Sequence, residues 1–477
     1  MANLTVMYWN VEVFGDTRNA ARGPYYVPVC NFVANVIHEA DADIFFLMEL
    51  RSGGVAYLDY IRKALNSLDG LAKGVNGWQY DYIPGAVIAN QARPINNFNQ
   101  LGYTQQGHSE GYAVFWRPNA NKFTMLITPD NLSAGKGPGG THNISLVLNG
   151  RPPNPFNGNY GWYTSPVFNP ANAYAFGNLD FPVPKPIHGG DYRLDLCRRP
   201  AYAVVRLVNT QGTNVDKLLP MIVFHAPNSP ASTRYGVQLC GYTRELYRVL
   251  DTTNVNTPTN INQAIVGGDF NINSNDQQNL AFDAYTVFTV NFAGSGANCN
   301  NIWVPYNAPP GNRTAVRLED RNGVINTNTP TDYYWLGIDN LFYRNANGNI
   351  NPVNPPANYN GPVFNLVAAV MQNGVLADNA RKQTTLRLFK NSINYEKQSG
   401  NYQYTNPANG TPCTTRNLVN GNYVYSGALI PYLLNYGNFM TDLTNGYFTH
   451  ARRAAEFIVN CISDHLPVVT RFQINNL

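Results

Sequence analysis

One run of residues limits the folds open to this chain more than any other feature. Residues 42–50, ADIFFLMEL, are almost continuously apolar. A strand of this kind is expected where other layers of structure cover both of its faces. Near the end of the run stands Glu49, a carboxylate that is costly to bury unless it is paired or bound to a metal. The sequence therefore predicts a buried sheet with polar chemistry at the end of a strand.

Further segments predict more strands and amphipathic helices. Apolar residues recur at helical spacing in residues 27–40 and 55–68, and a third helix is expected over 232–250. Strands are expected over residues 4–11, 80–84, 111–118, 198–208, 217–226, 263–271, 338–344 and 465–474. Helix–strand units followed by runs of strands predict two sheets packed against each other with helices outside them.

Three long stretches lack this periodicity. Residues 128–190, 274–335 and 345–450 are rich in Gly, Pro and Asn, with one helical segment around 364–376. We expect a single domain over residues 1–477 in which these stretches are insertions, the last of them long enough for a subdomain. Because loops carry specificity, the insertions are candidates for binding a partner protein or for oligomerisation.

The charge of the chain is compatible with a phosphate substrate but does not by itself indicate one. Charged residues are only 13% of the 477 residues, hydrophobic residues are 44%, and the net charge is +4. A non-specific nucleic-acid binder usually carries a basic stripe. Here the densest basic clusters are short, Arg198 with Arg199 and Arg452 with Arg453. The composition therefore suits a protein with a large core and a hydrogen-bonding surface.

Location and redox state are suggested by features that the sequence lacks. No stretch approaches the ~20 apolar residues that cross a bilayer, and the first residues, MANLTVMYWNVEVFG, have the pattern of a strand rather than of a secretory signal. We expect a chain that is cytoplasmic as synthesised, with export by a signal-independent route left open. The six cysteines are scattered without a CxxC pair, which favours buried free thiols over disulfides.

Polar residues stand at the ends of several expected strands. Asn10 follows the apolar MYW, Asp269 and Asn271 alternate after AIVGG, and Asp339 follows WLGI. The pair Asp464 and His465 precedes the last strand. One such carboxylate is usually structural, but a whole set of carboxylates and amides offers the hard oxygen ligands that suit magnesium, manganese or calcium.

These residues belong to motifs that resemble one known superfamily. The segments are WNVEVFGDT, ADIFFLMELRS, EGYAVFWRP, CRRPAYAVV, FHAPNSP, GGDFNIN, GIDNLFYR and ISDHLPVVT, in this order between residues 9 and 470. Their ordered set resembles the endonuclease/exonuclease/phosphatase superfamily, and within it most closely deoxyribonuclease I. The resemblance implies a four-layered α/β/β/α sandwich of two mixed sheets and a divalent-metal-dependent phosphodiesterase.

The resemblance also implies a metal site and a phosphate site. It implies that Glu49 binds Mg²⁺ (or Mn²⁺ or Ca²⁺), with Asn10 and Asp464 beside it. Asp269 and Asn271 match a pair that orients the nucleophilic water and the scissile phosphate, or holds a second metal. Arg198 would contact a phosphate oxygen, although Arg199 competes with it for this role. Asn228 would also contact a phosphate oxygen, although it could instead serve only to form a turn.

Two histidines complete the implied acid–base chemistry. His465 matches the general base and His225 the general acid, with the reverse assignment left open. Asp339 would hold His465, and Glu110 would hold His225 unless it is only a solvated acid. The chain departs from the family at Met48, where Gln is usual, and at Asn340, where Arg or His is common; Asn340 is expected to be structural.

Three functions are considered, in order of preference. The first is an endonuclease that hydrolyses DNA, with RNA as an alternative, because His225 stands in FHAP where the abasic-site repair branch usually has Tyr. The second is a phosphoesterase acting on a lipid headgroup or an inositol phosphate. The third is an inactive binding protein on the same fold.

Overall fold

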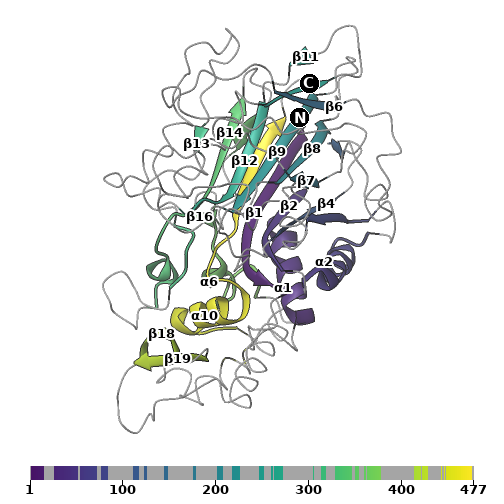
Figure 1. Ribbon diagram of the computed structural model, residues 1–477. Helices are drawn as coiled ribbons and strands as arrows, with labels where there is room; N and C mark the ends of the chain where they lie inside the picture. Colours follow the sequence, from purple (N-terminus) through teal and green to yellow (C-terminus); the bar gives the residue numbers. More distant parts are fainter. Residues whose placement is uncertain are drawn as a thin grey trace, which may run out of the picture.

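The computed structural model describes a two-sheet sandwich with helices (Figure 1). It describes residues 2–15, 26–51, 54–71, 77–83, 111–117, 123–125, 144–148, 176–178, 201–207, 217–225, 247–251, 259–260, 263–271, 304–305, 313–317, 328–345, 350–353, 359–360, 363–377, 413–419, 422–427, 442, 445 and 447–474.

The first sheet is built around the two amino-terminal strands. Its strands have the order β16-β17-β20-β1-β2-β4-β3, with β15 also on β20. The bounds are β1 (Ala2–Phe14), β2 (Ile44–Leu50), β3 (Gln79–Ile83), β4 (Gly111–Trp116), β15 (Ile350–Val353), β16 (Tyr359–Asn360), β17 (Val363–Phe364) and β20 (Val468–Ile474). Strand β1 is parallel to β2 and antiparallel to β20, so the sheet is mixed and joins both ends of the chain.

The second sheet has the order β13-β14-β12-β9-β8-β5, with β7 also on β8. Its strands are β5 (Phe123–Met125), β7 (Phe176–Asn178), β8 (Ala201–Leu207), β9 (Lys217–His225), β12 (Gln263–Asp269), β13 (Val304–Pro305) and β14 (Asp339–Asn345). Strand β12 is parallel to β9 and antiparallel to β14. This sheet is therefore mixed as well.

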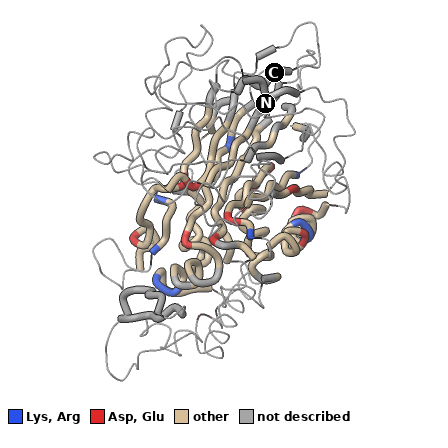
Figure 2. The backbone as a smooth tube through the Cα atoms, viewed as in Figure 1, with Lys and Arg blue, Asp and Glu red and all other residues tan. Residues whose placement is uncertain are grey.

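The two sheets pack face to face through an apolar core. Alternate residues of β1 and β2, among them Val6 and Phe46, meet residues of β9 and β12 such as Met221 and Ile265. Successive side chains of a strand point to opposite faces, so one set of alternate residues from each sheet fills the space between them. Figure 2 shows how sparse charged residues are along these strands.

The other face of the first sheet is covered by helices. These are α1 (Tyr26–Glu39), α2 (Val55–Leu68), α6 (Leu366–Ala369) and α10 (Ala451–Phe457), together with the 3₁₀ turn η6 (Pro330–Tyr333) and the π-helical turn η8 (Ile458–Ile462). Their apolar residues form one cluster with Met7, Trp9 and Leu47 of the sheet. Cys30 of α1 lies in this cluster as a buried free thiol. The predicted two-sheet α/β sandwich is confirmed.

Several sequence predictions hold closely and one fails. The helix predicted over 55–68 has those bounds, and α1 begins one residue earlier than expected. Within the helix predicted over 232–250, however, Tyr247–Asp251 form a strand, β10, because their backbone pairs with β6 (Ile144–Leu148). Such pairing overrides a weak helical propensity. Residues 232–246, and with them the expected helical layer on the second sheet, lie outside the described residues.

The three predicted insertions contain more regular structure than their composition indicated. Strands β6 and β7 lie within 128–190, and β13 within 274–335. The stretch 345–450 contributes β15, β16 and β17 to the first sheet and also holds a separate pair of strands, β18 (Cys413–Val419) and β19 (Asn422–Gly427). A further two-residue strand, β11 (Thr259–Asn260), pairs with β10. Within the described residues, no helix has the length and apolar character needed to span a bilayer.

Candidate functional site

Three neighbouring strands of the second sheet bring polar residues into one row. Asp269 is the last residue of β12, and its backbone partners are His225 at the end of β9 and Asp339 at the start of β14. All three side chains are buried, with exposed fractions of 1 to 3%. The end of this sheet is therefore polar although the strands leading to it are apolar.

Local irregularities in the first sheet aim two more residues at this row. The pairing of β1 with β2 shifts after Asn10, and that of β2 with β4 shifts between Met48 and Leu50. Glu49 has a φ of 60°. Bulges and left-handed residues of this kind re-aim side chains at functional sites. Here they turn Asn10 and Glu49 toward the second sheet.

Asn10 joins the two sheets at the site. Its Nδ2 donates to Glu49 Oε1 at 2.9 Å and to Asp269 Oδ2 at 3.1 Å, while its Oδ1 accepts from the Glu12 backbone at 3.0 Å. Because one amide contacts both carboxylates, the predicted grouping of Asn10, Glu49 and Asp269 is present in the structure.

Both imidazoles contact the same carboxylate oxygen. His225 Nε2 lies 3.3 Å from Asp269 Oδ2 and 3.5 Å from Glu49 Oε1. His465 Nε2 lies 3.7 Å from the same Asp269 oxygen. Residues from four distant parts of the sequence therefore meet at a single point.

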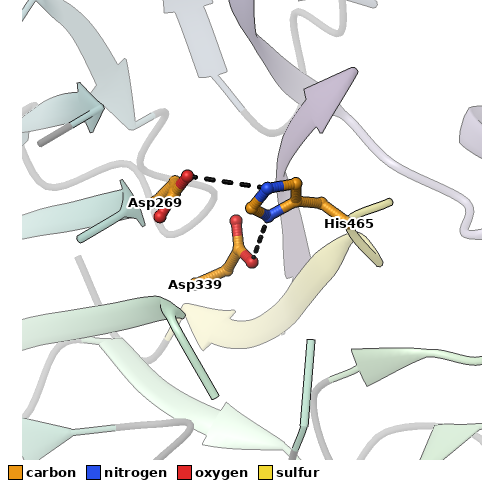
Figure 3. A group of neighbouring side chains, drawn as sticks. All are labelled: Asp269, Asp339 and His465. Atoms are coloured by element: carbon orange, nitrogen blue, oxygen red, sulfur yellow. Dashed lines mark hydrogen bonds and ion pairs between the residues drawn. The ribbon is translucent and has the colours of Figure 1, made fainter. Parts of the chain in front are cut away.

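His465 is held by a second carboxylate on its other ring nitrogen. Its Nδ1 lies 2.8 Å from Asp339 Oδ2, so the ring stands between Asp339 and Asp269 (Figure 3). Asp464 Oδ1 is 3.6 Å from Nε2, and its side chain is 45% exposed. The predicted pairing of Asp339 with His465 is therefore present.

Burial and charge shift the proton affinities of this group. Burial alone would lower the pKa of His465, but Asp339, Asp464 and Asp269 outweigh it and raise that pKa well above its usual value. Burial raises the pKa of Asp269, and the neighbouring histidines oppose this only in part. The site is therefore a place where proton affinities differ strongly from those in water.

The loop that carries His465 is fixed by contacts that were not predicted from the sequence. Ser463 Oγ donates to the Asn10 carbonyl at 2.6 Å and accepts from the His465 backbone at 3.0 Å. Trp9 Nε1 donates to the His465 carbonyl at 2.9 Å. Just before this loop, Ser463 N bonds to the Ile458 carbonyl five residues back, which closes the π-helical turn η8. Ser463 belongs to the ISDH motif, so its position was visible in the sequence.

Three other residues support the acidic row from outside it. Thr314 Oγ1 accepts from the Asp339 backbone at 2.9 Å, and Tyr112 Oη accepts from the His225 backbone at 3.1 Å. Met48 Sδ lies 3.3 Å from Asp269 N, so its sulfur accepts from the backbone of the acid. No sequence signal marks Thr314, which lies in a stretch predicted to be irregular.

Two glycines allow β12 to approach its neighbours closely. A Cβ on Gly267 would lie 2.7 Å from the ring of Tyr8, and one on Gly268 would lie 1.9 Å from the Phe224 carbonyl oxygen. Gly268 also has a φ of 148°, which side chains rarely tolerate. The GGD sequence thus sets the position of Asp269 relative to both sheets.

Some predicted site residues contact residues close to them in the sequence, and others lie outside the described residues. Asn271 has a φ of 52°, and its backbone donates to Asp269 Oδ1 at 2.8 Å. Asn340 accepts from the Leu341 backbone, as expected for a structural residue. The remaining predicted residues, and the competitor of one of them, lie outside the described residues: Glu110, Arg198, Arg199 and Asn228.

The basic pair near the carboxyl terminus belongs to the core. Arg453 is paired with the buried Asp442, and the Arg452 guanidinium lies 6.0 Å from the centre of the Tyr333 ring. Both arginines are at most 2% exposed. This basic cluster therefore offers no surface to a polyanion.

The donor set fits a hard divalent cation. Ligand atoms of Asp269, Asp339 and His465 lie within 4.8 Å of one another, and the Glu49 carboxylate faces the same histidine as Asp269. Carboxylate oxygens suit Mg²⁺, Mn²⁺ or Ca²⁺ better than they suit softer metals, and the Asn10 amide oxygen accepts from the Glu12 backbone. The individual ligand roles of Glu49, Asn10 and Asp464 stay predictions.

Comparison with known proteins gives structural neighbours only. No family model and no curated protein matches the chain. An endonuclease/exonuclease/phosphatase family protein from Bacteroides thetaiotaomicron is 13% identical with a TM-score of 0.39, over 99% of this chain and 98% of its own. TDP2 of D. rerio, humanized by 14 mutations, is 10% identical with a TM-score of 0.36, over 99% of each chain.

The catalytic domain of human Nocturnin is a third neighbour, 13% identical with a TM-score of 0.33, over 73% of this chain and 84% of its own. The structural neighbours include proteins described as members of the endonuclease/exonuclease/phosphatase family. At these scores, the fold and the site are assigned from the strand order and contacts of this chain itself.

Proposed function

We propose that this chain is a divalent-metal-dependent phosphodiesterase that hydrolyses nucleic acid, with DNA preferred and RNA as the alternative. The observation that carries the proposal is the position of Asp269 between two imidazoles, His225 at 3.3 Å and His465 at 3.7 Å. Asp339 orients the second imidazole. Buried titratable groups that face one another, here with raised pKa values for Asp269 and His465, are candidates for acid–base catalysis.

The two histidines divide the proton transfers of hydrolysis. His465, oriented through Nδ1 by Asp339, takes a proton from the attacking water at Nε2. A bond forms between the water oxygen and phosphorus, and the bond from phosphorus to the leaving oxygen breaks. His225 gives that oxygen a proton from Nε2. The products are a phosphomonoester and an alcohol.

The carboxylates provide the place for a cation. Glu49 and Asp269 would hold it, with the Asn10 amide fixing the spacing of their oxygens. A bound Mg²⁺ supplies charge relief to the phosphoryl oxygens and offsets the negative charge around His465. Asn10 also links the two sheets at this point, because it donates a hydrogen bond to an acid from each of them.

A plasmid assay tests this function directly. Supercoiled plasmid is incubated with the protein and Mg²⁺, with and without a chelator, and conversion to open-circular and linear forms is monitored. The variant Asp269→Asn, purified in the same way, controls for a contaminating nuclease. Cleavage that needs Mg²⁺ and is lost in the variant supports the proposal, and cleavage that is identical in both preparations contradicts it.

Parallel substrates separate the alternative functions. Release of headgroup phosphate from phospholipid vesicles, without plasmid cleavage, would favour a lipid or inositol phosphoesterase on the same site. The non-specific diester bis(p-nitrophenyl) phosphate reports the chemistry without a nucleic-acid requirement. A protein that turns over none of these substrates with Mg²⁺, Mn²⁺ or Ca²⁺ would be an inactive binder.

A further inference from the structure

An exposed cation stacks on an aromatic ring close to His465. The Arg317 guanidinium carbon lies 4.5 Å from the centre of the Trp335 ring. Arg317 is exposed and Trp335 is half-buried. Neither residue belongs to an apolar cluster of the core, and neither takes part in the proposed proton transfers.

Backbone pairing places this pair on the same face as the catalytic histidine. Ala315 forms an antiparallel bridge with His465, and Trp335 N bonds to the Ala315 carbonyl at 2.8 Å. Opposed residues of antiparallel strands point to the same face. His465, Ala315 and Trp335 therefore form a row across three strand segments. Adjacent strands lie about 4.8 Å apart, which puts Trp335 roughly 10 Å from His465.

The opposite face of these segments points into the protein. Val316 bridges Tyr334, and both side chains are buried in the core on the helical side of the first sheet. In this row, Ala315 is the residue between His465 and Trp335, and it is half-buried and carries only a methyl side chain. The row thus runs from the buried imidazole outward to the exposed guanidinium, with one small side chain between them.

The chemistry of the pair suits a nucleobase. No ion pair joins Arg317 to a carboxylate within the described part of the chain, so its charge is not neutralised there. Its guanidinium lies over the indole ring, and bases stack on both guanidinium planes and aromatic rings. A base stacked here would lie beside a phosphate held at His465.

We propose that Arg317 and Trp335 form a stacking platform for a nucleobase next to the scissile phosphate of a single-stranded or locally unpaired nucleic acid. The inference rests on the proposed function, because the platform lies beside the site that would hydrolyse the strand. The side chain of Ala315, between the platform and His465, is small enough to leave room for the strand. The pair sets how strongly the enzyme holds a strand with bases, as opposed to a bare sugar–phosphate chain.

Equilibrium binding tests the platform without any need for turnover. Binding of a fluorescein-labelled single-stranded oligodeoxynucleotide is measured by anisotropy in the presence of chelator, beside a strand of equal length made of abasic residues. The two strands carry the same phosphates, so the ratio of their Kd values isolates the contribution of the bases. Stacking on one platform is expected to contribute a factor of about ten to this ratio.

Variants of the pair and a matched control give the decisive comparison. Arg317→Ala and Trp335→Ala should each lower the ratio by about tenfold. Arg317→Lys should lower it as well, because it keeps the charge and loses the planar group. Lys63→Ala removes another exposed cation, 5.6 Å from the Tyr60 ring on α2, and should leave the ratio unchanged. Thermal unfolding midpoints verify that each variant is folded.

Each outcome separates the platform from the catalytic proposal. An unchanged ratio in Arg317→Ala and Trp335→Ala, or a wild-type ratio near one, overturns the platform even when plasmid cleavage is normal. A ratio restored by Arg317→Lys shows a charge contact in place of stacking and also overturns it. A loss of the ratio in the variants, in a protein that cleaves no phosphodiester, upholds the platform and removes the proposed hydrolysis.

Discussion

Two buried aspartates lie near opposite ends of strand β2, Asp43 just before it and Asp269 of β12 beside Glu49, and they have very different partners. Asp43 is fully buried, accepts from the Thr5 backbone at 2.9 Å and pairs with Arg117 at 3.2 Å. Arg117 also contacts Asp41 and Asp69. At the other end, Asp269 meets two imidazoles and an amide, and no Lys or Arg within the described residues.

The difference indicates that the residues around Asp43 and Arg117 are structural and that those around Asp269 are suited to catalysis. Burying a carboxylate is costly unless an opposite charge and hydrogen bonds compensate. The aspartates around Arg117 outweigh burial and raise the pKa of its guanidinium, so this network keeps fixed charges. Burial raises the pKa of Asp269. The imidazoles beside Asp269 can exchange protons near neutral pH, whereas the guanidinium of Arg117 keeps its charge.

The largest expected effect contrasts a histidine from each end. His465→Ala should lower the Mg²⁺-dependent rate of phosphodiester hydrolysis by about 10² to 10⁴, because it removes a group of the acid–base pair. His38→Ala removes an imidazole that contacts Asp69 at 2.6 Å in the arginine-matched network and should change the rate little. Initial rates on plasmid are compared, and equal losses in both variants would abolish the distinction between the two ends.

Next in size is the effect of Arg117→Ala on stability. Loss of its guanidinium breaks the ion pair with the buried Asp43, and breaking a buried pair costs about 3 kcal/mol. Denaturant unfolding measures the free energy, and hydrolysis by the folded variant should match that of the wild type. Were the unfolding free energy unchanged, the structural assignment of this network would be wrong.

A slightly smaller effect is expected from metal binding. Mg²⁺ at about 100 times its Kd should raise the free energy of unfolding by about 2.7 kcal/mol, because the folded site binds it and the unfolded chain does not. Glu49→Gln should abolish most of this increment, and Asp69→Asn, at the arginine-matched end, should keep it. Thermal unfolding with and without Mg²⁺ is the measurement. Equal increments in both variants would place the cation elsewhere.

The smallest effect is a change in one pKa. Asp339→Asn keeps a hydrogen-bond acceptor beside His465 but removes a charge that raises its pKa, so that pKa should fall. In the metal-free protein, the raised pKa of His465 contributes to the stability of the fold. This contribution is fully present below the unfolded-state pKa of about 6.5 and is lost as pH rises through the folded-state pKa. NMR titration of the imidazole reports the pKa, and an equal or higher value in the variant would contradict this account.

Much of the fold was predictable because its strands are long apolar runs that end in polar residues. Strands β2, β9 and β12 each have this form, so their course and their polar ends could be predicted together. The helix expected over 232–250 failed at its carboxyl-terminal end, residues 247–250, because helical spacing in one segment does not reveal a partner strand about a hundred residues away. Pairing between distant segments decides such cases.

The site shows the same division. Asn10, Glu49, His225, Asp269, Asp339 and His465 were predicted to meet, and their side chains contact one another. Thr314 and Tyr112 were missed because their roles are hydrogen bonds to the backbones of residues 25 and 113 positions away. A hydroxyl that supports a distant backbone leaves no pattern in its own segment. The Arg317–Trp335 pair was missed because a contact between two side chains in a stretch without periodicity leaves no pattern either.

The position of His465 depends on the number of residues in the π-helical turn before Ser463. Its bond from Ser463 N to the Ile458 carbonyl spans five residues where an α-helix spans four. Deleting a single residue there would favour the tighter turn and rotate the next residues by about 100°, carrying the imidazole of His465 away from both of its acids. Anyone shortening or transplanting this piece of chain has to count residues as carefully as choose them.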